Sequence, residues 1–136
     1  MFPKETKILI IEDSPSMRKT IKTILGKLGF KHIYEAGDGT NGFTIIETQH
    51  MANEPIGLVL CDWWMPKESG LDLLKRVRES NTLSNISFIM VTAEGEKSKI
   101  LEAIREGVDN YIVKPFSPRD IKTKLAETWA RLSQAK

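Results

Sequence analysis

The sequence contains one cysteine, two histidines and no long hydrophobic run. A lone cysteine cannot form a disulfide within the chain, so nothing indicates an oxidising compartment. No apolar stretch approaches the roughly 18 residues of a membrane span, and Met1–Glu12 lacks the pattern of a secretory signal peptide. These absences predict a cytoplasmic protein that makes no use of a membrane.

An excess of one charge is also missing. The chain has 20 Lys and Arg against 18 Asp and Glu, a net charge of +2, and the signs are interspersed. It therefore lacks the basic stripe that binds nucleic acid, and it has no acidic tail. A hydrophobic content of 40% in 136 residues is typical of a globular domain with a single core. We expect one domain over residues 1–136 and no nucleic-acid partner.

Short apolar runs alternate with segments of helical periodicity along the whole chain. Five runs predict strands: Lys7–Ile11, His32–Ala36, Leu58–Cys61, Phe88–Val91 and Tyr111–Val113. Helical patterns follow them, at about 15–28, 41–50, 71–80, 96–106 and from 118 onward. This alternation predicts an α/β fold, a doubly wound five-stranded parallel sheet with helices on both faces. The flavodoxin-like strand order 2-1-3-4-5 is the expected arrangement.

Capping residues mark several of the predicted helix ends. Ser14 and Pro15 suit an N-cap and a first helical position, and Ser117–Asp120 resembles a capping box with Asp in place of Glu. Gly107 is a natural helix stop. The two C-terminal helices are predicted to turn these apolar residues inward: Ile100, Leu101 and Ile104, then Ile121, Leu125, Trp129 and Leu132.

Acidic residues end two strands that become neighbours in this order. Glu12 and Asp13 follow the first strand, and Asp62 follows the third. Two carboxylates about 4 Å apart repel by roughly 4 kcal/mol at an effective dielectric of 20, so three of them need a strong counter-charge. One lysine, Lys114, cannot supply it, whereas a divalent cation can. Oxygen ligands without His or Cys favour Mg²⁺ or Mn²⁺ over zinc.

The fourth and fifth strands bring two further groups to the same edge, Thr92 and Lys114. A metal, a carboxylate, a hydroxyl and an ammonium are what phosphoryl transfer to an aspartate requires. Taken singly, Thr92 could cap a strand and Lys114 could be solvated. Their joint occurrence at four strand ends favours the catalytic interpretation.

Motifs in this order resemble response-regulator receiver domains, particularly the stand-alone chemotaxis regulators of the CheY type. The matching stretches cover essentially the whole chain: Glu12-Asp13, DWWMP at Asp62–Pro66, GLDLL at Gly70–Leu74, VTAE at Val91–Glu94 and YIVKPF at Tyr111–Phe116. The resemblance implies that Asp62 is the phosphoacceptor and that Asp13 is a direct Mg²⁺ ligand. Glu12 would act mostly through water, and the main-chain carbonyl of Trp64 would complete the coordination.

The same resemblance implies roles for residues of the last strands. Thr92 and Tyr111 would form the switch pair, and Lys114 would contact the phosphoryl group. Tyr111 and Lys124 would belong to the partner surface. A cis Lys114–Pro115 bond is also implied.

The sequence departs from the receiver pattern at Trp64, where a small polar residue is common. Trp64 and Glu94, each two residues beyond a site residue, are expected to flank the path of hydrolytic water and to tune dephosphorylation. An indole folded over the site would exclude water and prolong the phosphorylated state, which is the favoured outcome. An indole turned outward would leave an exposed aromatic for a partner.

The expected function is a phosphorylation-controlled binding module rather than an enzyme. The resemblance implies a histidine kinase as donor, a flagellar motor switch protein as target, and a phosphatase as a further potential partner. Only about one helix follows Pro118, so we expect no output domain, and we expect a monomer. A non-motility phosphorelay shuttle is the alternative. An aspartyl-phosphate phosphotransferase needs a second Asp where Trp64 stands, and a flavodoxin-like cofactor binder needs a phosphate loop where Glu12-Asp13 stands.

Overall fold

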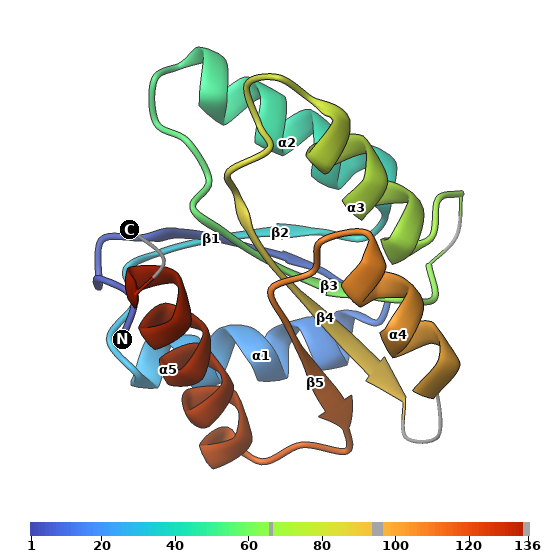
Figure 1. Cartoon of the computed structure of the whole chain (residues 1–136). Helices are drawn as coiled ribbons and strands as arrows, with labels where there is room; N and C mark the ends of the chain where they lie inside the picture. The colour runs from blue at the N-terminus through green and yellow to red at the C-terminus, as the bar shows by residue number, and fades with distance from the viewer. Residues whose placement is uncertain (66, 94–96, 135–136) are drawn as a thin grey trace.

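The computed structural model describes residues 1–65, 67–93 and 97–134, which form five strands and five helices (Figure 1). The strands are β1 (Lys7–Ile11), β2 (His32–Ala36), β3 (Leu58–Asp62), β4 (Ser87–Ala93) and β5 (Asn110–Lys114). The helices are α1 (Pro15–Lys27), α2 (Gly39–Met51), α3 (Gly70–Glu79), α4 (Lys97–Arg105) and α5 (Pro118–Gln134).

The strands form one parallel sheet in the order β2-β1-β3-β4-β5, which confirms the predicted fold class and strand order. All five residues of β3 are buried, as expected for the centre of a sheet covered on both faces. Since all strands run the same way, the ends of β1, β3, β4 and β5 meet at one edge, called here the carboxyl edge.

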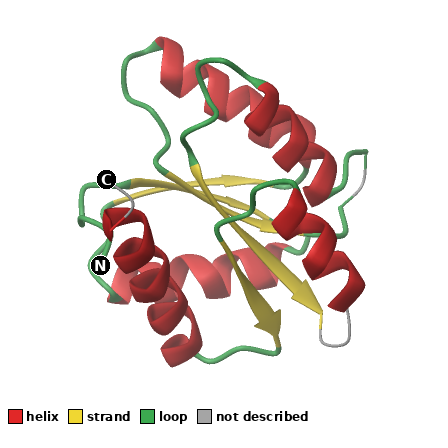
Figure 2. Cartoon of the chain, in the orientation of Figure 1, coloured by secondary structure: helices red, strands yellow, loops and turns green. Residues whose placement is uncertain are grey.

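Helices cover both faces of the sheet (Figure 2). Alternate strand residues point to opposite faces, so Ile8 and Ile10 of β1 pack with α1 and α5, whereas Leu9 and Ile11 pack with α2, α3 and α4. Each face thereby has its own apolar core, and the sheet between them is held from both sides.

Local capping follows the sequence closely. The Ser14 hydroxyl accepts a hydrogen bond from the Met17 amide at the start of α1. At α5 the Asp120 amide donates to the Ser117 hydroxyl, and the Ser117 amide donates to the Asp120 carboxylate, so the predicted capping box is confirmed. The Lys114–Pro115 bond is cis, as the receiver resemblance implies.

Two predictions about helices are wrong in detail. Helix α2 begins at Gly39 rather than Asn41, because Asp38 acts as its N-cap and accepts a hydrogen bond from the Asn41 amide. In α4 the predicted inward face is rotated: Leu101 is 58% exposed and Ile104 52% exposed, while Ala103 is buried. The small alanine lets the helix lie close to the sheet, and the larger side chains then face outward.

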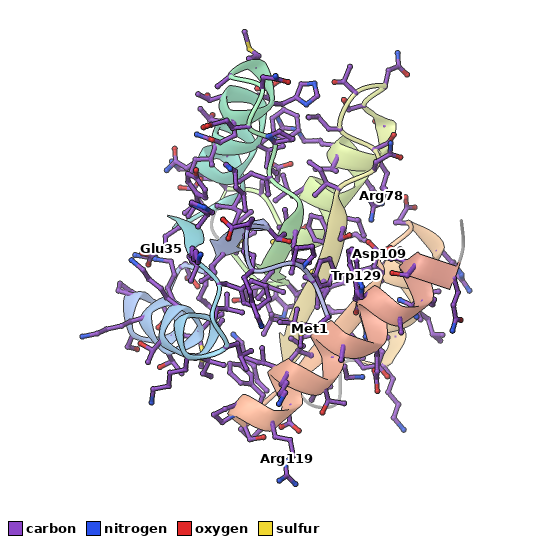
Figure 3. All side chains as sticks on the ribbon, turned by 90° about the vertical axis from the view of Figure 1, so that its left-hand side faces the viewer. Met1, Glu35, Arg78, Asp109, Arg119 and Trp129 are labelled. Atoms are coloured by element: carbon purple, nitrogen blue, oxygen red, sulfur yellow. The ribbon has the colours of Figure 1, made fainter. Side chains whose placement is uncertain are left out.

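The opposite, amino edge of the sheet is held by Arg78 of α3 (Figure 3). Its guanidinium forms an ion pair with Asp109 at 2.9 Å and donates to the carbonyl oxygens of Ser84, Ile86 and Gly107. Asp109 also accepts from the Phe88 amide at the start of β4. The loops at this edge are thus joined by one side chain. No helix within the described ranges has the length and apolar character that a membrane crossing requires.

Candidate functional site

Three carboxylates meet at the carboxyl edge, where β1 and β3 are neighbours. Oxygen atoms of Glu12, Asp13 and Asp62 lie within 4.8 Å of one another, as the predicted strand order requires. Glu12 is 2% exposed and Asp62 is buried, whereas Asp13 is exposed. Two of the three charges are therefore removed from water, which strengthens their repulsion.

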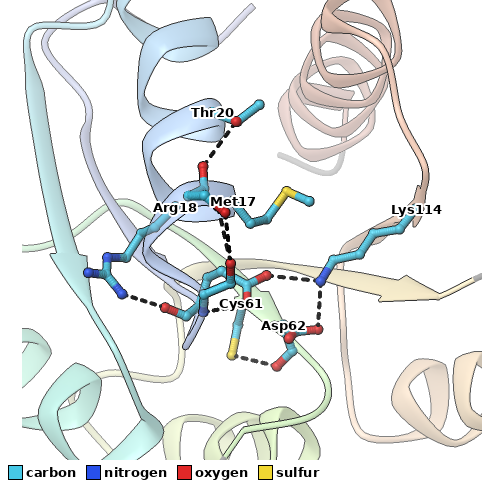
Figure 4. Close-up of polar contacts among 9 residues, drawn as sticks. Met17, Arg18, Thr20, Cys61, Asp62 and Lys114 are labelled. Atoms are coloured by element: carbon cyan, nitrogen blue, oxygen red, sulfur yellow. Dashed lines mark hydrogen bonds and ion pairs between the residues drawn. The ribbon is translucent and has the colours of Figure 1, made fainter.

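Lys114, at the end of β5, reaches both buried carboxylates (Figure 4). Its Nζ lies 2.9 Å from Glu12 Oε1 and 3.4 Å from Asp62 Oδ1. Burial disfavours the ammonium charge, but the hydrogen bond to Glu12 and the charges of Asp62 and Glu12 outweigh burial and raise the pKa of Lys114. The lysine is thus held in its charged form at the mouth of the cluster.

Lys114 does not cancel all of the repulsion among the three carboxylates, and the remainder affects Asp13. Although Asp13 is exposed as a residue, partial desolvation of its carboxyl, followed by the hydrogen bond and charge of Glu12, raises the pKa of that carboxyl. Oxygen donors of this kind, with excess negative charge and without His or Cys, suit a hard divalent cation. The residues present therefore fit Mg²⁺, as the sequence predicts.

Thr92 brings a buried hydroxyl to the carboxyl edge. The side chain lies near the end of β4, is 1% exposed, and its Oγ1 forms no hydrogen bond within the described residues. A buried hydroxyl left unpaired is destabilising by about 1–3 kcal/mol, and such groups call for a functional explanation. Thr92 pairs with Val113 of β5, two residues after Tyr111, so Thr92 and Tyr111 lie on the same face of the sheet.

Gly70 fixes the loop after Asp62 in a way that the sequence analysis did not anticipate. A Cβ at this position would collide with the Asp62 carbonyl oxygen and would lie 2.9 Å from Met90 Sδ. The Gly70 amide also donates to the Trp63 carbonyl at 2.9 Å. The sequence analysis named Gly70 only as the first residue of the GLDLL motif, because a close approach of backbone to backbone leaves no signal in the sequence.

The two tryptophans after Asp62 have opposite environments. Trp63 is buried in the core beneath α3, whereas Trp64 is 56% exposed and lies under the Lys99 ammonium, 4.5 Å from the ring centroid. Trp64 is thus exposed, as the outward alternative requires, and its shielding of the site from hydrolytic water stays a prediction. Glu94, its predicted counterpart, lies outside the described residues.

The predicted partner residues Tyr111 and Lys124 contact each other. The Lys124 ammonium lies 4.6 Å from the centroid of the Tyr111 ring, which is partly buried against the core. The Tyr111 ring thus packs against the apolar core on one side and contacts the Lys124 ammonium of α5 on the other.

One residue near the site escaped the sequence analysis. Arg18, in the first turn of α1, donates to the Glu12 carbonyl at 2.7 Å and to Glu35 of β2 at 3.3 Å. The available signal was the position of Arg18, six residues after Glu12 in the first turn of the following helix, from which a long side chain can reach back to the end of the strand. Cys61 is fully buried, and burial raises the pKa of its thiol well above the ordinary value, which fits a structural role.

The family described as "Response regulator receiver domain" matches residues 8–126. The chain is 41% identical to "Chemotaxis protein CheY1" of Helicobacter pylori over 88% of this chain and 93% of that protein. It is 38% identical to "Chemotaxis protein CheY-3" of Vibrio cholerae over 95% of each. A solved receiver domain protein of Clostridium thermocellum superposes with a TM-score of 0.81 at 26% identity, covering 96% of this chain and 99% of that one.

Proposed function

Because the chain belongs to the response regulator receiver domain family, we propose that it is a single-domain regulator phosphorylated on Asp62 by a histidine kinase. The observation that carries the proposal is one constellation: three clustered carboxylates, a charged lysine touching two of them, and a buried threonine hydroxyl without a partner among the described residues. It acts as a regulatory phosphoacceptor in the cytoplasm, not as an enzyme that turns over a separate substrate.

The phosphoryl step uses the buried carboxylate as a nucleophile. An Asp62 oxygen attacks the phosphorus of a phosphohistidine, the new O–P bond forms as the N–P bond breaks, and the imidazole leaves with the electron pair. Asp13, Asp62 and the Trp64 carbonyl would hold Mg²⁺, with Glu12 acting through water, and the ion would supply positive charge to the phosphoryl oxygens. Lys114 already stands 3.4 Å from Asp62 and supplies a second positive charge.

The switch follows from the unpartnered hydroxyl. A phosphoryl oxygen on Asp62 offers Thr92 the acceptor that it lacks, so the hydroxyl moves toward the site. The Tyr111 ring, on the same face, then turns inward into the space behind it, and the surface around Tyr111 and Lys124 changes. A partner that prefers the inward arrangement stabilises it.

The partner is proposed from the relatives. Proteins named for chemotaxis share about 40% of their residues with this chain, which favours a chemotaxis kinase as donor and a flagellar motor switch protein as target. A non-motility phosphorelay is the alternative. A pull-down of the motor switch protein with and without phosphorylation tests the target, and Tyr111→Ala should weaken only the phosphorylation-dependent part of binding.

The central experiment is phosphorylation by acetyl phosphate followed by intact mass. Wild type should gain one phosphoryl group in the presence of Mg²⁺ and none after chelation. Asp62→Asn should abolish the gain, whereas Asp72→Asn, an exposed aspartate in the first turn of α3, should not. Labelling of the Asp62→Asn variant at the wild-type rate would contradict the assignment.

Trp64 and Glu94 remain proposed tuners of phosphoryl lifetime. With the indole exposed, Trp64→Asn should hasten spontaneous loss of phosphate by less than tenfold, which corresponds to a barrier change of less than about 1.4 kcal/mol. First-order decay at fixed Mg²⁺, without a phosphatase, measures it. Slower decay in the variant would show that the indole offers no shield.

A further inference from the structure

Trp64 and Lys99 connect the loop after the phosphoacceptor to helix α4. Trp64 is two residues beyond Asp62, and Lys99 lies in the first turn of α4, with its Nζ 4.5 Å from the indole centroid. An ammonium over the face of an indole is attracted by the ring quadrupole. Lys99 is itself partly covered, so the contact is partly shielded from water.

Helix α4 is weakly fixed by apolar burial, which gives this contact more influence. Ala103 is the one buried residue of α4 among those that the structure describes, and Leu101 and Ile104 face outward. Helix α3 on the same face buries five residues, Gly70, Leu71, Leu73, Leu74 and Val77. Elements with few buried apolar contacts shift at low free-energy cost. A single side-chain contact can therefore bias where α4 lies.

We propose that the Trp64–Lys99 contact is a tether that holds α4 in the arrangement where Thr92 is not engaged, and that Lys99 is a positioning residue for the switch. This inference rests on the proposed function, because it concerns the response to a phosphoryl group on Asp62. The tether coexists with a Thr92 hydroxyl that has no hydrogen-bond partner in the described ranges, so it belongs to the disengaged arrangement.

The chain geometry explains how phosphorylation opposes the tether. Trp64 is attached to β3 next to Asp62, whereas Lys99 follows Thr92 by seven residues along the β4–α4 connection. When the Thr92 hydroxyl moves toward a phosphoryl oxygen, the start of α4 is displaced relative to the Trp64 ring. The stacked ammonium then loses its place over the ring face.

The size of the effect follows from the strength of such contacts. A cation–π contact at a partly exposed site corresponds to about a two- to fivefold change in an equilibrium constant. A contact shifts a two-state equilibrium only by the difference between its interaction free energies in the two states. Removing the tether should therefore favour the engaged state by about two- to fivefold.

The test uses beryllium fluoride with Mg²⁺ as a phosphoryl analogue, bound to the full chain. Lys99→Met keeps the aliphatic stem and removes the charge, and Trp64→Leu removes the ring. Each should bind the analogue about two- to fivefold more tightly by calorimetry, and the double variant no more tightly than either single one. Lys99→Arg, which keeps a cation over the ring, should retain wild-type affinity. Lys97→Met, an exposed lysine of the same turn, is the matched control and should also leave affinity unchanged.

Hydrogen exchange in α4 separates a tether from a merely structural contact. Faster exchange in Lys99→Met together with tighter analogue binding supports the proposal, whereas faster exchange with unchanged or weaker binding overturns it. Additive effects in the double variant would also overturn it. A wild-type chain that fails to bind the analogue, or an Asp62→Asn variant that binds it equally, contradicts the proposed function instead.

Discussion

The two edges of the sheet treat their charged and polar groups in opposite ways. At the amino edge, the Arg78 guanidinium and the Asp109 carboxylate are both bonded, to each other and to backbone groups of two loops and of β4. At the carboxyl edge, Lys114 contacts two of three clustered carboxylates, and the Thr92 hydroxyl has no partner among the described residues.

This difference separates stability from function within a single fold. Satisfied polar groups fix loops in one arrangement, because removing any partner leaves a buried group unpaired. Polar groups that lack partners within the fold can instead form hydrogen bonds or ionic contacts with a ligand. The fold thus concentrates its binding capacity at one end of the strands and its rigidity at the other.

The largest effect is expected from breaking the amino edge. Arg78→Met leaves the half-buried Asp109 without its counter-charge and frees three carbonyl oxygens, which should lower the free energy of unfolding by about 3 kcal/mol. Urea unfolding measures the loss. Phosphorylation of the folded fraction by acetyl phosphate should continue, because the carboxyl edge is intact. A variant as stable as wild type would show that this network does not stabilise the loops at the amino edge.

A methyl group at Gly70 tests the close contact beside the site. Gly70→Ala drives a Cβ against the Asp62 carbonyl and Met90, and overpacking of this kind lowers the free energy of unfolding by about 2 kcal/mol. Since the clash displaces the backbone of Asp62, the proposed phosphoacceptor, the rate of phosphorylation should also fall. Gly26→Ala in α1 is the control, because nothing lies within 4 Å of the added methyl. Its stability should rise by several tenths of a kcal/mol.

Two buried threonines provide the sharpest form of the comparison. The Thr128 hydroxyl accepts from Asn110 at 3.0 Å and donates to the Lys124 carbonyl at 2.6 Å, whereas the Thr92 hydroxyl has no partner within the described ranges. Thr128→Val should lower the free energy of unfolding by about 1 kcal/mol, and Thr92→Val should raise it by a similar amount. Paired denaturation curves give the two signs. Equal signs would contradict the distinction between the edges.

The smallest effect is expected at an exposed ion pair. The hydrogen bond from Lys22, followed by the charges of Lys22 and Arg18, lowers the pKa of Glu35 despite partial burial. A lowered folded pKa means stability that is present above the unfolded pKa and lost as pH falls through the folded pKa. Glu35→Gln should therefore cost about 0.5 kcal/mol near pH 7, and the difference from wild type should vanish in acid. Unfolding curves at both pH values, with Glu47→Gln as control, measure it.

The sequence predicted what depends on strand order and local chemistry. Periodicity and capping residues gave the strand and helix alternation, and the order 2-1-3-4-5 brought Asp62 to Glu12 and Asp13. The face of α4 was mispredicted, because Leu101 and Ala103 satisfy a helical pattern equally well until the packing distance is known. The bonds of Arg18 and the environment of Trp64 depend on side-chain conformations that no periodicity encodes.

The buried thiol of Cys61 has a practical consequence for measurement. It is the single cysteine of the chain, it is fully buried, and it precedes Asp62 on β3. Its side chain lies in the core beneath α2 and α3, so a thiol reagent can reach it only when these helices move away from the sheet, and the rate of alkylation in the native protein reports that opening. The unmodified chain thus carries its own kinetic probe of how firmly Asp62 is held, with and without Mg²⁺ or a phosphoryl group.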